Sequence, residues 1–445
     1  MTSTEALYQL YLKYPIISTD SRKIVPGSLF FALKGDKFDA NTFAEAAVAS
    51  GAAYTVIDNP AYQLSEQYLL VPDVLMALQD LARRHRRQLH IPVIGLTGSN
   101  GKTTTKELIN AVLSQRFNTY ATQGNLNNHI GVPLTVLSIN KQHEAAVIEM
   151  GANHQKEIEL LSSIAQPSHG LITNVGKAHL EGFGGIAGVR KGKGELYDFL
   201  ASAKKGITFV NSDDPVLVAM AHERSLHPIV YYGNTDNSSM VSGKIIGNDA
   251  LLKLEWTDKR SQNSYIVETH LTGEYNLPNI LAAIAIGLYF DIDPAVINAG
   301  ISGYQPNNNR SQITHTATNI LICDYYNANP SSMAVAIENL SKLDAAQKVL
   351  ILGDMFEMGA EAGAEHETII KKALAAGVDE RIFIGAEFQK AAQSMDHGPS
   401  TIDNTVFHPG VEAASAYLKN NPIQNATVLI KGSRGMALER LVELF

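Results

Sequence analysis

The sequence predicts an α/β protein of three domains: a small α/β N-terminal domain, a central domain on a parallel sheet, and a C-terminal Rossmann-like domain. The 445 residues suffice for about three domains, and 45% apolar with 18% charged residues is an ordinary globular composition. Residues 92–113 have the pattern of strand, glycine-rich turn and helix, and residues 311–445 alternate strand and helix patterns. Both patterns are typical of parallel sheets. We therefore place the domains at residues 1–90, 91–308 and 309–445.

Charge and composition narrow the class of protein. A formal net charge of −8 argues against nucleic acid as the main partner. Cys323 is the single cysteine, so no disulfide can form within the chain, which fits a reducing cytosol. The first residues lack the basic and apolar regions of a signal peptide. The longest apolar run, Ile280–Phe290, is shorter than the ~18 residues that span a bilayer. We expect a cytoplasmic protein without membrane insertion.

The first 90 residues predict strands and helices beside one short polar turn. These elements are expected at Ser28–Leu33, Thr42–Ser50, Ala53–Ile57 and Asp73–Leu89. In the turn Thr19–Arg22, Ser21 and Arg22 could hold a diphosphate through a hydroxyl and a forked guanidinium, although a plain surface turn is the commoner outcome. The basic run Arg83–Arg87 is expected to be a solvated helix end, where cations suit the helix dipole, rather than a phosphate site.

The strongest chemical signal follows the apolar run Pro92–Thr97, which predicts a buried strand. A glycine-rich turn leads from it into a predicted helix at Lys106–Leu113. Gly98 and Gly101 allow the backbone to turn tightly and to approach an anion closely. The N–H groups of such a loop and the N-terminus of its helix point towards phosphate.

The residues after Gly101 give this turn the chemistry of a P-loop. Lys102 would reach the β- and γ-phosphates of a nucleotide, and the hydroxyl of Thr103 would bind Mg²⁺. The spacing departs from the strict Walker motif, which would have glycine where this chain has Leu96. The matching glycine is Gly98. The alternative is an ordinary glycine turn, but Gly-Lys-Thr at a helix start favours binding of ATP or GTP.

Three later side chains are expected at the same edge of the sheet. Glu149 ends the predicted strand Ala145–Gly151, where P-loop enzymes carry a partner of Mg²⁺, although a plain strand-end carboxylate is the alternative. His179 follows the predicted strand Gly170–Val175, and ligands bind at the carboxyl ends of parallel strands. By sequence alone Lys193, in a helix predicted to begin at Lys191, is expected to be solvated.

The rest of the central domain is predicted in outline. Loops are expected at residues 122–135 and 232–243 and a linker at 304–310, because these stretches are rich in Asn, Gly and other polar residues. The amides of the first loop could instead orient a polar ligand. Strands are expected at Gly206–Asn211 and Tyr265–Gly273, and a buried helix at Asn276–Phe290.

Four apolar runs with helical patterns between them predict the C-terminal sheet, at residues 320–324, 349–354, 381–385 and 427–432. Asp324, Asp354 and Lys431 stand at strand ends, so a ligand-binding edge is plausible. No Gly-x-Gly-x-x-Gly sequence follows these strands, and a dinucleotide is not predicted.

Several of these segments together resemble the Mur ligases, the ATP-dependent amide-forming enzymes of peptidoglycan precursor synthesis. They occur in the same order along nearly the whole chain: residues 19–22, the P-loop with its three threonines, 124–128, 149–154, 173–175, 324–330, 352–359 and 431–434. The segments 324–330 and 352–359 resemble the family member that adds a dipeptide.

The resemblance implies a three-domain ligase in which ATP and two Mg²⁺ ions serve the reaction. Its implied substrates are UDP-N-acetylmuramoyl-tripeptide and D-alanyl-D-alanine, and a monomer is expected. The tripeptide carboxylate would attack the γ-phosphate, giving an acyl phosphate and ADP. The dipeptide amine would then displace phosphate. Positioning and electrostatics would supply most of the catalysis. Ligand groups on both sides of the 304–310 linker suggest a form that is open without ligand and closes on binding.

The resemblance also assigns roles to individual residues. Lys193 matches a lysine that is carbamylated and supports the second Mg²⁺, and His179 and Glu149 match metal ligands alongside Thr103. Nucleotide-binding positions are Gly98, Ser99, Asn100, Gly101, Lys102, Thr103, Thr104, Asn276, Asn279, Arg310 and Asp324. Positions for the UDP-linked substrate are Ser21, Arg22, Thr122 and Asn125. Acceptor positions are Asn327, Asn329, Lys431 and Ser433.

Two departures from the family pattern are visible. The family often has Asp-Gly-His where this chain has Asp39-Ala40-Asn41, and glycine where Asn309 precedes Arg310.

Alternative functions stay open at this level. One is another amide ligase of the same fold, such as the third-residue-adding ligase, whose expected Asp-Asn-Pro-Arg motif is absent, or folylpolyglutamate synthase. Another is a P-loop NTPase acting as a switch or motor, which would hydrolyse nucleotide without an amine acceptor. A non-catalytic nucleotide-binding regulator is disfavoured because Lys102, Thr103, Glu149, His179 and Lys193 occur together. The sequence does not distinguish meso-diaminopimelate from lysine in the tripeptide.

Overall fold

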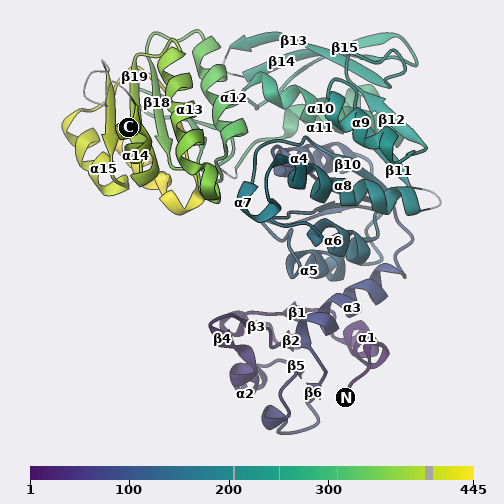
Figure 1. The fold of residues 1–445 in the computed structure, drawn as a ribbon. Helices are drawn as coiled ribbons and strands as arrows, with labels where there is room; N and C mark the ends of the chain where they lie inside the picture. The colour runs from purple at the N-terminus through teal and green to yellow at the C-terminus, as the bar shows by residue number, and fades with distance from the viewer. Residues whose placement is uncertain (204–205, 250, 308, 396–403) are drawn as a thin grey trace.

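The computed structural model describes residues 1–203, 206–249, 251–307, 309–395 and 404–445. It confirms an α/β protein in three parts, each with its own sheet (Figure 1). The N-terminal part lies below the central part, and the C-terminal part lies beside the central part at the upper left. The expected domain boundary at Asn308 lies outside the described residues.

The N-terminal part has a parallel four-stranded sheet in the order β1-β2-β5-β6. Its strands and helices are β1 (Ile17–Ser18), β2 (Leu29–Phe31), β5 (Tyr54–Ile57), β6 (Tyr68–Leu70), α1 (Thr4–Lys13) and α2 (Ala44–Ala49). A small hairpin joins β3 (Lys34–Gly35) to β4 (Phe38–Asp39). Apolar strand residues alternate between two cores: Phe31 packs on the α1 side, and Phe30 packs near α2.

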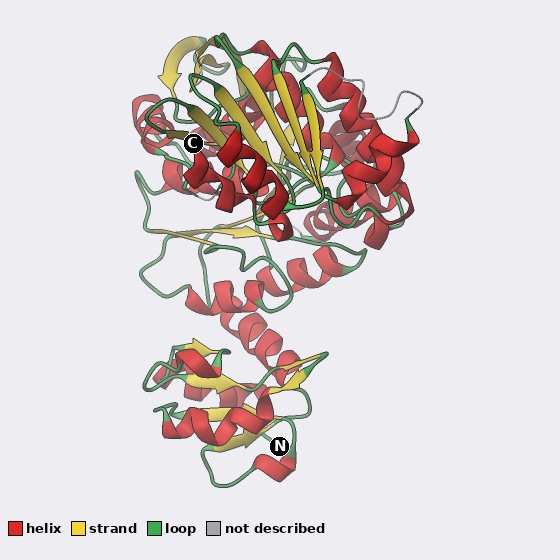
Figure 2. Cartoon of the chain, turned by 90° about the vertical axis from the view of Figure 1, so that its left-hand side faces the viewer, coloured by secondary structure: helices red, strands yellow, loops and turns green. Residues whose placement is uncertain are grey.

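Helix α3 (Val74–Arg86) connects this part to the central one and packs against α1, α5 and α6 (Figure 2). The solvated helix end expected at Arg83–Arg87 is wrong for two residues, because His85 and Arg86 are buried. The Arg86 guanidinium donates to the carbonyls of Ala165, Gln166 and Leu89 at 2.7–2.9 Å. Arg86 therefore ties the end of α3 to the end of α6 (Glu157–Ala165).

The central sheet has nine strands in the order β15-β14-β13-β12-β11-β10-β7-β9-β8, with parallel pairing from β8 through β13. The parallel strands are β7 (Val93–Thr97), β8 (Thr119–Ala121), β9 (Ala145–Glu149), β10 (His169–Ile172), β11 (Ile207–Asn211), β12 (Ile229–Tyr232) and β13 (Val241–Asp249). Parallel order places β7, β9 and β10 side by side with their carboxyl ends at one edge.

Helices cover both faces of this sheet. One face carries α4 (Lys102–Leu113), α10 (Leu277–Tyr289) and α11 (Pro294–Gly303); the other carries α5 (Gly131–Ser138), α6, α7 (Leu180–Phe183) and α8 (Ile186–Ser202), while α9 (Pro215–Glu223) follows β11. Successive strand residues point to opposite cores, since Val93 packs with Ile148 and Ile94 packs with Val147. A strand buried on both faces gives the continuous apolar runs of the sequence.

An antiparallel extension of this sheet was not predicted. Strand β14 (Leu251–Asp258) pairs with β13 and with β15 (Asn263–Glu268), and the expected strand Tyr265–Gly273 ends early, at Glu268. Along β14 buried residues alternate with mostly half-buried ones, and Trp256 is fully buried against α11. Because charged residues lie between the apolar ones, this strand contains no long apolar run and is not recognised by that pattern.

The C-terminal part has a six-stranded sheet in the order β16-β17-β21-β18-β19-β20. The strands are β16 (Gln312–His315), β17 (Ile320–Asp324), β18 (Lys348–Gly353), β19 (Glu380–Ile384), β20 (Thr405–His408) and β21 (Thr427–Lys431); only β16 is antiparallel. Helices α12 (Pro330–Lys342), α13 (Ala362–Ala375), α14 (Ala386–Ser394) and α15 (Val411–Asn420) flank it (Figure 2). Cys323 lies buried in β17, and burial raises the pKa of its thiol.

The predicted loop at 122–135 is partly wrong, because α5 begins inside it at Gly131. Asn128 Oδ1 accepts the N–H groups of Ile130 and Gly131 and so starts the helix. The predicted helix start at Lys191 is also wrong, since α8 begins at Ile186.

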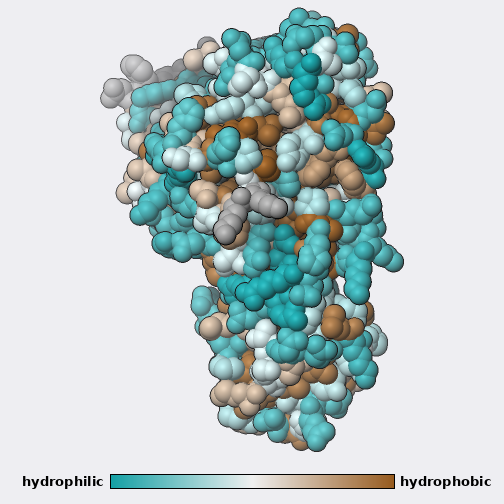
Figure 3. Space-filling view, turned by 90° about the vertical axis from the view of Figure 1, so that its right-hand side faces the viewer, coloured by the Kyte–Doolittle hydropathy of each residue, from teal (hydrophilic) through white to brown (hydrophobic). Residues whose placement is uncertain are grey.

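On the face drawn in Figure 3, apolar residues form small patches among hydrophilic ones, and the narrower lower part is the N-terminal part. None of the described helices combines the length and the apolar character needed to cross a bilayer.

Candidate active site

A cavity of about 860 Å³ lies between the central and C-terminal parts. From the central part it is lined by the loops after β7, β9 and β10 and by the start of α10; from the C-terminal part it is lined by the loops after β17, β18 and β21. Two parallel sheets therefore direct the carboxyl ends of their strands at one space, as ligand sites of α/β proteins require.

The loop between β7 and α4 has the backbone of a phosphate-binding turn. Gly98 and Gly101 have φ values of +150° and +77°. A Cβ on Gly98 would stand 1.9 Å from Thr173 Oγ1, so only glycine fits there. Ser99 N–H donates to Asn174 O, and Asn100 N–H donates to Asn174 Oδ1, both at 3.0 Å. The loop is thus held in this shape by Asn174, just beyond the neighbouring strand β10.

Lys102 folds back over this loop. Its Nζ donates to the carbonyls of Gly98 and Ser99 at 2.7 and 3.2 Å. Burial lowers the pKa of Lys102 to about 8; the charge of Glu149 opposes this shift, and that of Arg310 adds to it. Both of its partners are backbone carbonyls, so the ammonium stays available for a bound anion.

Among the buried oxygen atoms without a hydrogen-bond partner in the described part of the chain are Thr103 Oγ1 and Glu149 Oε2, both beside the loop. Glu149 is opposite Leu96 in the β7–β9 pairing, and its other oxygen accepts from Asn127 Nδ2 at 2.8 Å. Burying unpaired oxygen atoms costs free energy. These two atoms have the chemistry of ligands for a hard cation.

The structure contradicts the solvated Lys193 expected from the sequence alone, because the side chain is 1% exposed. Its Nζ donates to Ala152 O at 3.2 Å and lies 5.0 Å from the centre of the Phe183 ring. Burial, followed by repulsion from Lys102, holds the pKa of Lys193 well below its ordinary value. Lys193 lies near the middle of α8, on the side of the helix that also buries Val189 and Leu196.

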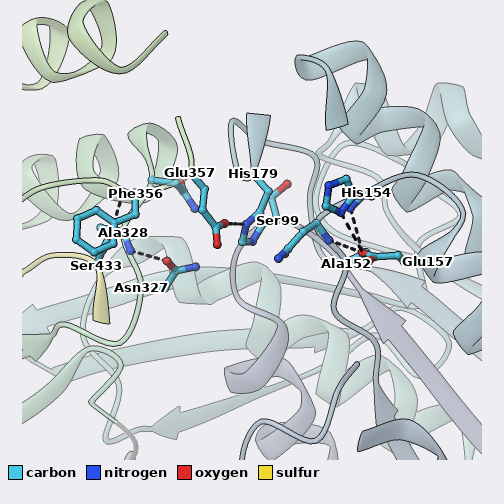
Figure 4. Close-up of polar contacts among 12 residues, drawn as sticks. Ser99, Ala152, His154, Glu157, His179, Asn327, Ala328, Phe356, Glu357 and Ser433 are labelled. Atoms are coloured by element: carbon cyan, nitrogen blue, oxygen red, sulfur yellow. Dashed lines mark hydrogen bonds and ion pairs between the residues drawn. The ribbon is translucent and has the colours of Figure 1, made fainter. Parts of the chain in front are cut away.

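His179 meets a carboxylate of the other domain (Figure 4). Its Nδ1 lies in a short hydrogen bond with Glu357 Oε2, from the loop after β18. This bond, with the charge of His179, holds the pKa of Glu357 below its ordinary value. Within the described ranges no group of three or more His, Cys, Asp or Glu side chains is arranged to hold a metal ion.

A second contact joins the domains at the P-loop. Asn329 Nδ2 donates to Asn100 Oδ1 at 2.8 Å, and Asn329 also caps α12 by accepting from Ser332 N–H. On the far side of the loop, Thr105 Oγ1 donates to Asn279 Oδ1, and Asn279 Nδ2 donates to Asn276. Both of these asparagines are buried, yet both line the cavity.

Charged groups of the C-terminal part line the opposite wall. Lys431 Nζ donates to Asp324 Oδ2 at 2.7 Å across the β17–β21 pair. Arg310 lies 3.9 Å from the centre of the Tyr326 ring, and Arg434 lies 4.9 Å from it. Arg310 Nε is buried and has no partner among the described residues.

The cavity gathers most of the predicted site residues but not all. Its lining includes these: Ser99, Asn100, Gly101, Lys102, Thr104, Asn125, Glu149, His179, Asn276, Asn279, Arg310, Asp324, Asn327, Asn329 and Lys431. Gly98, Thr103 and Lys193 are not lining residues themselves, but each lies next to residues that are. Ser433 is also not a lining residue. Its hydroxyl accepts a hydrogen bond from Phe356 N–H (Figure 4).

The residues expected to hold the UDP-linked substrate are not brought together. Ser21 and Arg22 lie in the N-terminal part, away from the cavity, where Arg22 is exposed and paired with Asp20. Thr122 is fully buried, and its hydroxyl accepts from Glu149 N–H at 3.0 Å. Their roles in binding therefore stay predictions.

Among the cavity residues to which the sequence assigns no role are Tyr326, Glu357 and Arg434. Each lies within or beside a segment that carries the family resemblance, so its neighbourhood was visible. The partner of each lies far away in the chain or in the other domain, and this pairing could not be read from spacing.

Comparisons with known proteins agree with this architecture. Family models match three segments: "Mur ligase family, catalytic domain" at residues 13–86, "Mur ligase middle domain" at 96–287, and "Mur ligase, glutamate ligase domain" at 309–434. The UDP-N-acetylmuramoyl-tripeptide–D-alanyl-D-alanine ligase of Escherichia coli is 36% identical, over 96% of this chain and 92% of that protein.

Solved structures are similar over nearly the full length. A MurF crystal structure from Acinetobacter baumannii has a TM-score of 0.85 at 31% identity, covering 96% of this chain and 92% of that one. MurF ligase from Thermotoga maritima in complex with ADP has a TM-score of 0.85 at 24% identity, covering 98% and 97%, and shows the fold alone. With three family models in order and full-length relatives above 30% identity, the chain belongs to the Mur ligase family.

Proposed function

We propose that this chain joins D-alanyl-D-alanine to UDP-N-acetylmuramoyl-tripeptide with ATP, giving UDP-N-acetylmuramoyl-pentapeptide for peptidoglycan synthesis in the cytoplasm. One observation carries the proposal: a single cavity is lined by a P-loop from one domain and by polar groups of a second domain. A ligase needs phosphoryl transfer and amine attack in one place. The full-length relatives named for this reaction support the choice of substrates.

The chain's own residues would position the first step. The N–H groups of Lys102, Thr103 and Thr104 at the start of α4 would hold the ATP phosphates, and the Lys102 ammonium would neutralise charge on the transferred phosphoryl group. A carboxylate oxygen of the tripeptide attacks the γ-phosphorus, the bond to ADP breaks, and an acyl phosphate forms. Asn276 and Asn279 would border the adenine, and Arg310 and Asp324 would reach the nucleotide from the C-terminal domain.

The second step needs no enzyme nucleophile. The dipeptide amine attacks the acyl carbon, loses a proton, and phosphate leaves. Asn327, Asn329, Lys431 and Ser433 would surround this acceptor. The first three line the cavity, and Ser433 fixes the loop of Phe356.

The residues present fit Mg²⁺, which would offset phosphate charge when bound. Thr103 Oγ1 and Glu149 Oε2 are unpaired buried oxygens and would be ligands. For a second ion, His179 and a carbamylated Lys193 would join Glu149. Carbamylation requires a neutral amine, which attacks CO₂ and releases a proton. The burial of Lys193 favours that neutral form.

We propose further that residues 1–90 bind the UDP end through Ser21 and Arg22, that 91–308 bind ATP, and that 309–445 bind the acceptor. Thr122 and Asn125 would complete the UDP-substrate site. The matched family segments, 13–86, 96–287 and 309–434, support these divisions.

The test is phosphate release from Mg-ATP with UDP-N-acetylmuramoyl-tripeptide present and D-alanyl-D-alanine added or withheld. Release that requires both, with the pentapeptide seen by mass spectrometry, is the expected result. Tripeptides with meso-diaminopimelate or lysine would then identify the third residue. Release indifferent to the dipeptide would contradict the proposal and favour a sibling ligase or an NTPase.

A further inference from the structure

Five charged side chains of the C-terminal part line the cavity. Two of them differ from the others in their charge partners. Asp324 and Lys431 neutralise each other, and Arg310 is assigned to the nucleotide. Glu357 and Arg434 have no ion-pair partner within their own domain among the described residues: Glu357 meets only His179 of the central domain, and Arg434 meets only the Tyr326 ring. This domain therefore offers one carboxylate and one guanidinium to the cavity.

The two side chains stand on adjoining, rigidly joined loops. Strands β18 and β21 are neighbours, with Leu352 opposite Lys431. The loops beyond them are linked by Phe356 N–H donating to Ser433 Oγ at 2.9 Å and by Ser433 N–H donating to Asp354 O at 3.1 Å (Figure 4). The sheet and these two bonds therefore hold the backbones of the two loops next to each other.

A buried histidine holds the loop that carries Glu357. His366 is fully buried, its Nε2 accepts from Met355 N–H at 3.0 Å, and its Nδ1 donates to Ala362 O at 2.7 Å. Asp354 accepts the N–H groups of Glu387 and Phe388 at the start of α14. Such support is typical of loops that present a binding group.

Opposite charges on one wall suit a zwitterion. Glu357 lies towards the central domain, at His179, whereas Arg434 lies towards Tyr326, and the two form no ion pair with each other in the described ranges. A free dipeptide carries an ammonium and a carboxylate at its ends, up to about 7 Å apart when extended. Guanidinium binds carboxylate through two parallel hydrogen bonds.

We propose that Glu357 binds the ammonium, and Arg434 the carboxylate, of the zwitterionic dipeptide acceptor; this inference rests on the proposed function. Glu357 Oε1 makes no hydrogen bond in the described part of the chain and is free to receive an N–H donor while Oε2 contacts His179. The pair sets the length and the charge pattern of the acceptor. Glu357 places the amine at the side of the cavity that carries the P-loop.

Arg434→Gln tests the carboxylate end. Wild-type enzyme should prefer D-alanyl-D-alanine to its C-terminal amide in kcat/KM, and Arg434→Gln should lose that preference by about tenfold to a hundredfold. Arg434→Lys should retain part of it. Arg440→Gln is the matched control, since Arg440 is exposed, pairs with Glu412 and lies outside the cavity. An unchanged dipeptide-to-amide ratio in Arg434→Gln would overturn the proposal.

Glu357→Gln tests the ammonium end. The KM for the dipeptide should rise about tenfold or more, while the KM values for ATP and the UDP-linked tripeptide stay within twofold. Glu361→Gln, an exposed carboxylate four residues away, is the control. A rise confined to the KM for ATP would show that Glu357 acts only through His179 and would overturn the assignment. Wild-type enzyme without dipeptide-dependent phosphate release would instead refute the proposed function itself.

Discussion

The two walls of the cavity differ in whether their polar contacts stay within one domain or cross between two. On the P-loop wall, the polar contacts of Ser99 and Asn100 with residues 173–176 are made within one domain. On the facing wall, Glu357 reaches His179 and Asn329 reaches Asn100 across the domain boundary. The P-loop is therefore supported within the central domain alone, whereas Glu357 and Asn329 of the acceptor wall also contact the opposite domain. The P-loop should keep its shape during domain motion, whereas the contacts of Glu357 and Asn329 with the central domain should depend on it.

The largest effect is expected on the P-loop wall. Lys102→Ala removes the ammonium held over the P-loop, and we expect kcat to fall about 10²–10³-fold, as for loss of a preorganised electrostatic group. Phosphate release under saturating substrates measures it. Lys141→Ala, on an exposed loop, serves as the control. Retained activity in Lys102→Ala would mean that this wall does not carry phosphoryl transfer.

Lys193→Ala should also remove most activity, and added bicarbonate should not restore it. The side chain is buried and supplies the amine that carbamylation needs, so nothing nearby replaces it. Lys191→Ala, two residues earlier in the same helix but exposed, is the matched control. Near wild-type rates for Lys193→Ala would remove this residue from the mechanism.

A moderate effect is expected where one residue serves both the fold and the domain junction. Asn329→Ala loses the cap of α12, worth about 1 kcal/mol of unfolding free energy, and also the contact with Asn100. Asp214→Ala loses the comparable cap of α9, away from the cavity. Thermal melting should respond to both variants, but the KM for the dipeptide should rise only in Asn329→Ala. Equal KM values would show that the junction contact is passive.

The smallest effect is expected at the rim of the junction. Half-exposed Lys177 pairs with the largely buried Glu365 across the domains. Glu365→Gln keeps the side-chain shape and leaves only the hydrated Lys177 without its ion pair, so it should cost less than about 1 kcal/mol. Small-angle scattering should show compaction of the wild type when an ATP analogue and the UDP-linked tripeptide are added, and the variant should compact similarly. No compaction of the wild type would refute ligand-driven closure.

The two walls also differ in how far the sequence predicts them. The P-loop, Glu149 and the positions of several strands are local patterns: a glycine turn, a residue at a strand end and an apolar run. Each was visible without the fold. The contact of His179 with Glu357 joins residues 178 positions apart, and only domain packing brings them together.

The burial of individual side chains is the second property that the sequence predicts poorly. Lys193 is expected in solvent because lysine is usually exposed, but it lies on the buried side of α8. Arg86 was hidden in a basic run whose neighbour Arg84 pairs with Glu5 at the surface. Strand β14 was missed because its alternating charges resemble a loop. In each case the residue type indicates only the environment that such a side chain usually has, whereas its actual environment depends on the tertiary structure.

The environment of Cys323 makes the protein a simple subject for site-specific labelling. The thiol lies in the core of the C-terminal sheet, where burial raises its pKa and little thiolate forms at neutral pH. Alkylating dyes should therefore spare it, and a cysteine introduced on any exposed position becomes the one reactive handle on the chain. Pairs of such handles, one on each domain, would report inter-domain distances by fluorescence transfer without first removing the natural cysteine.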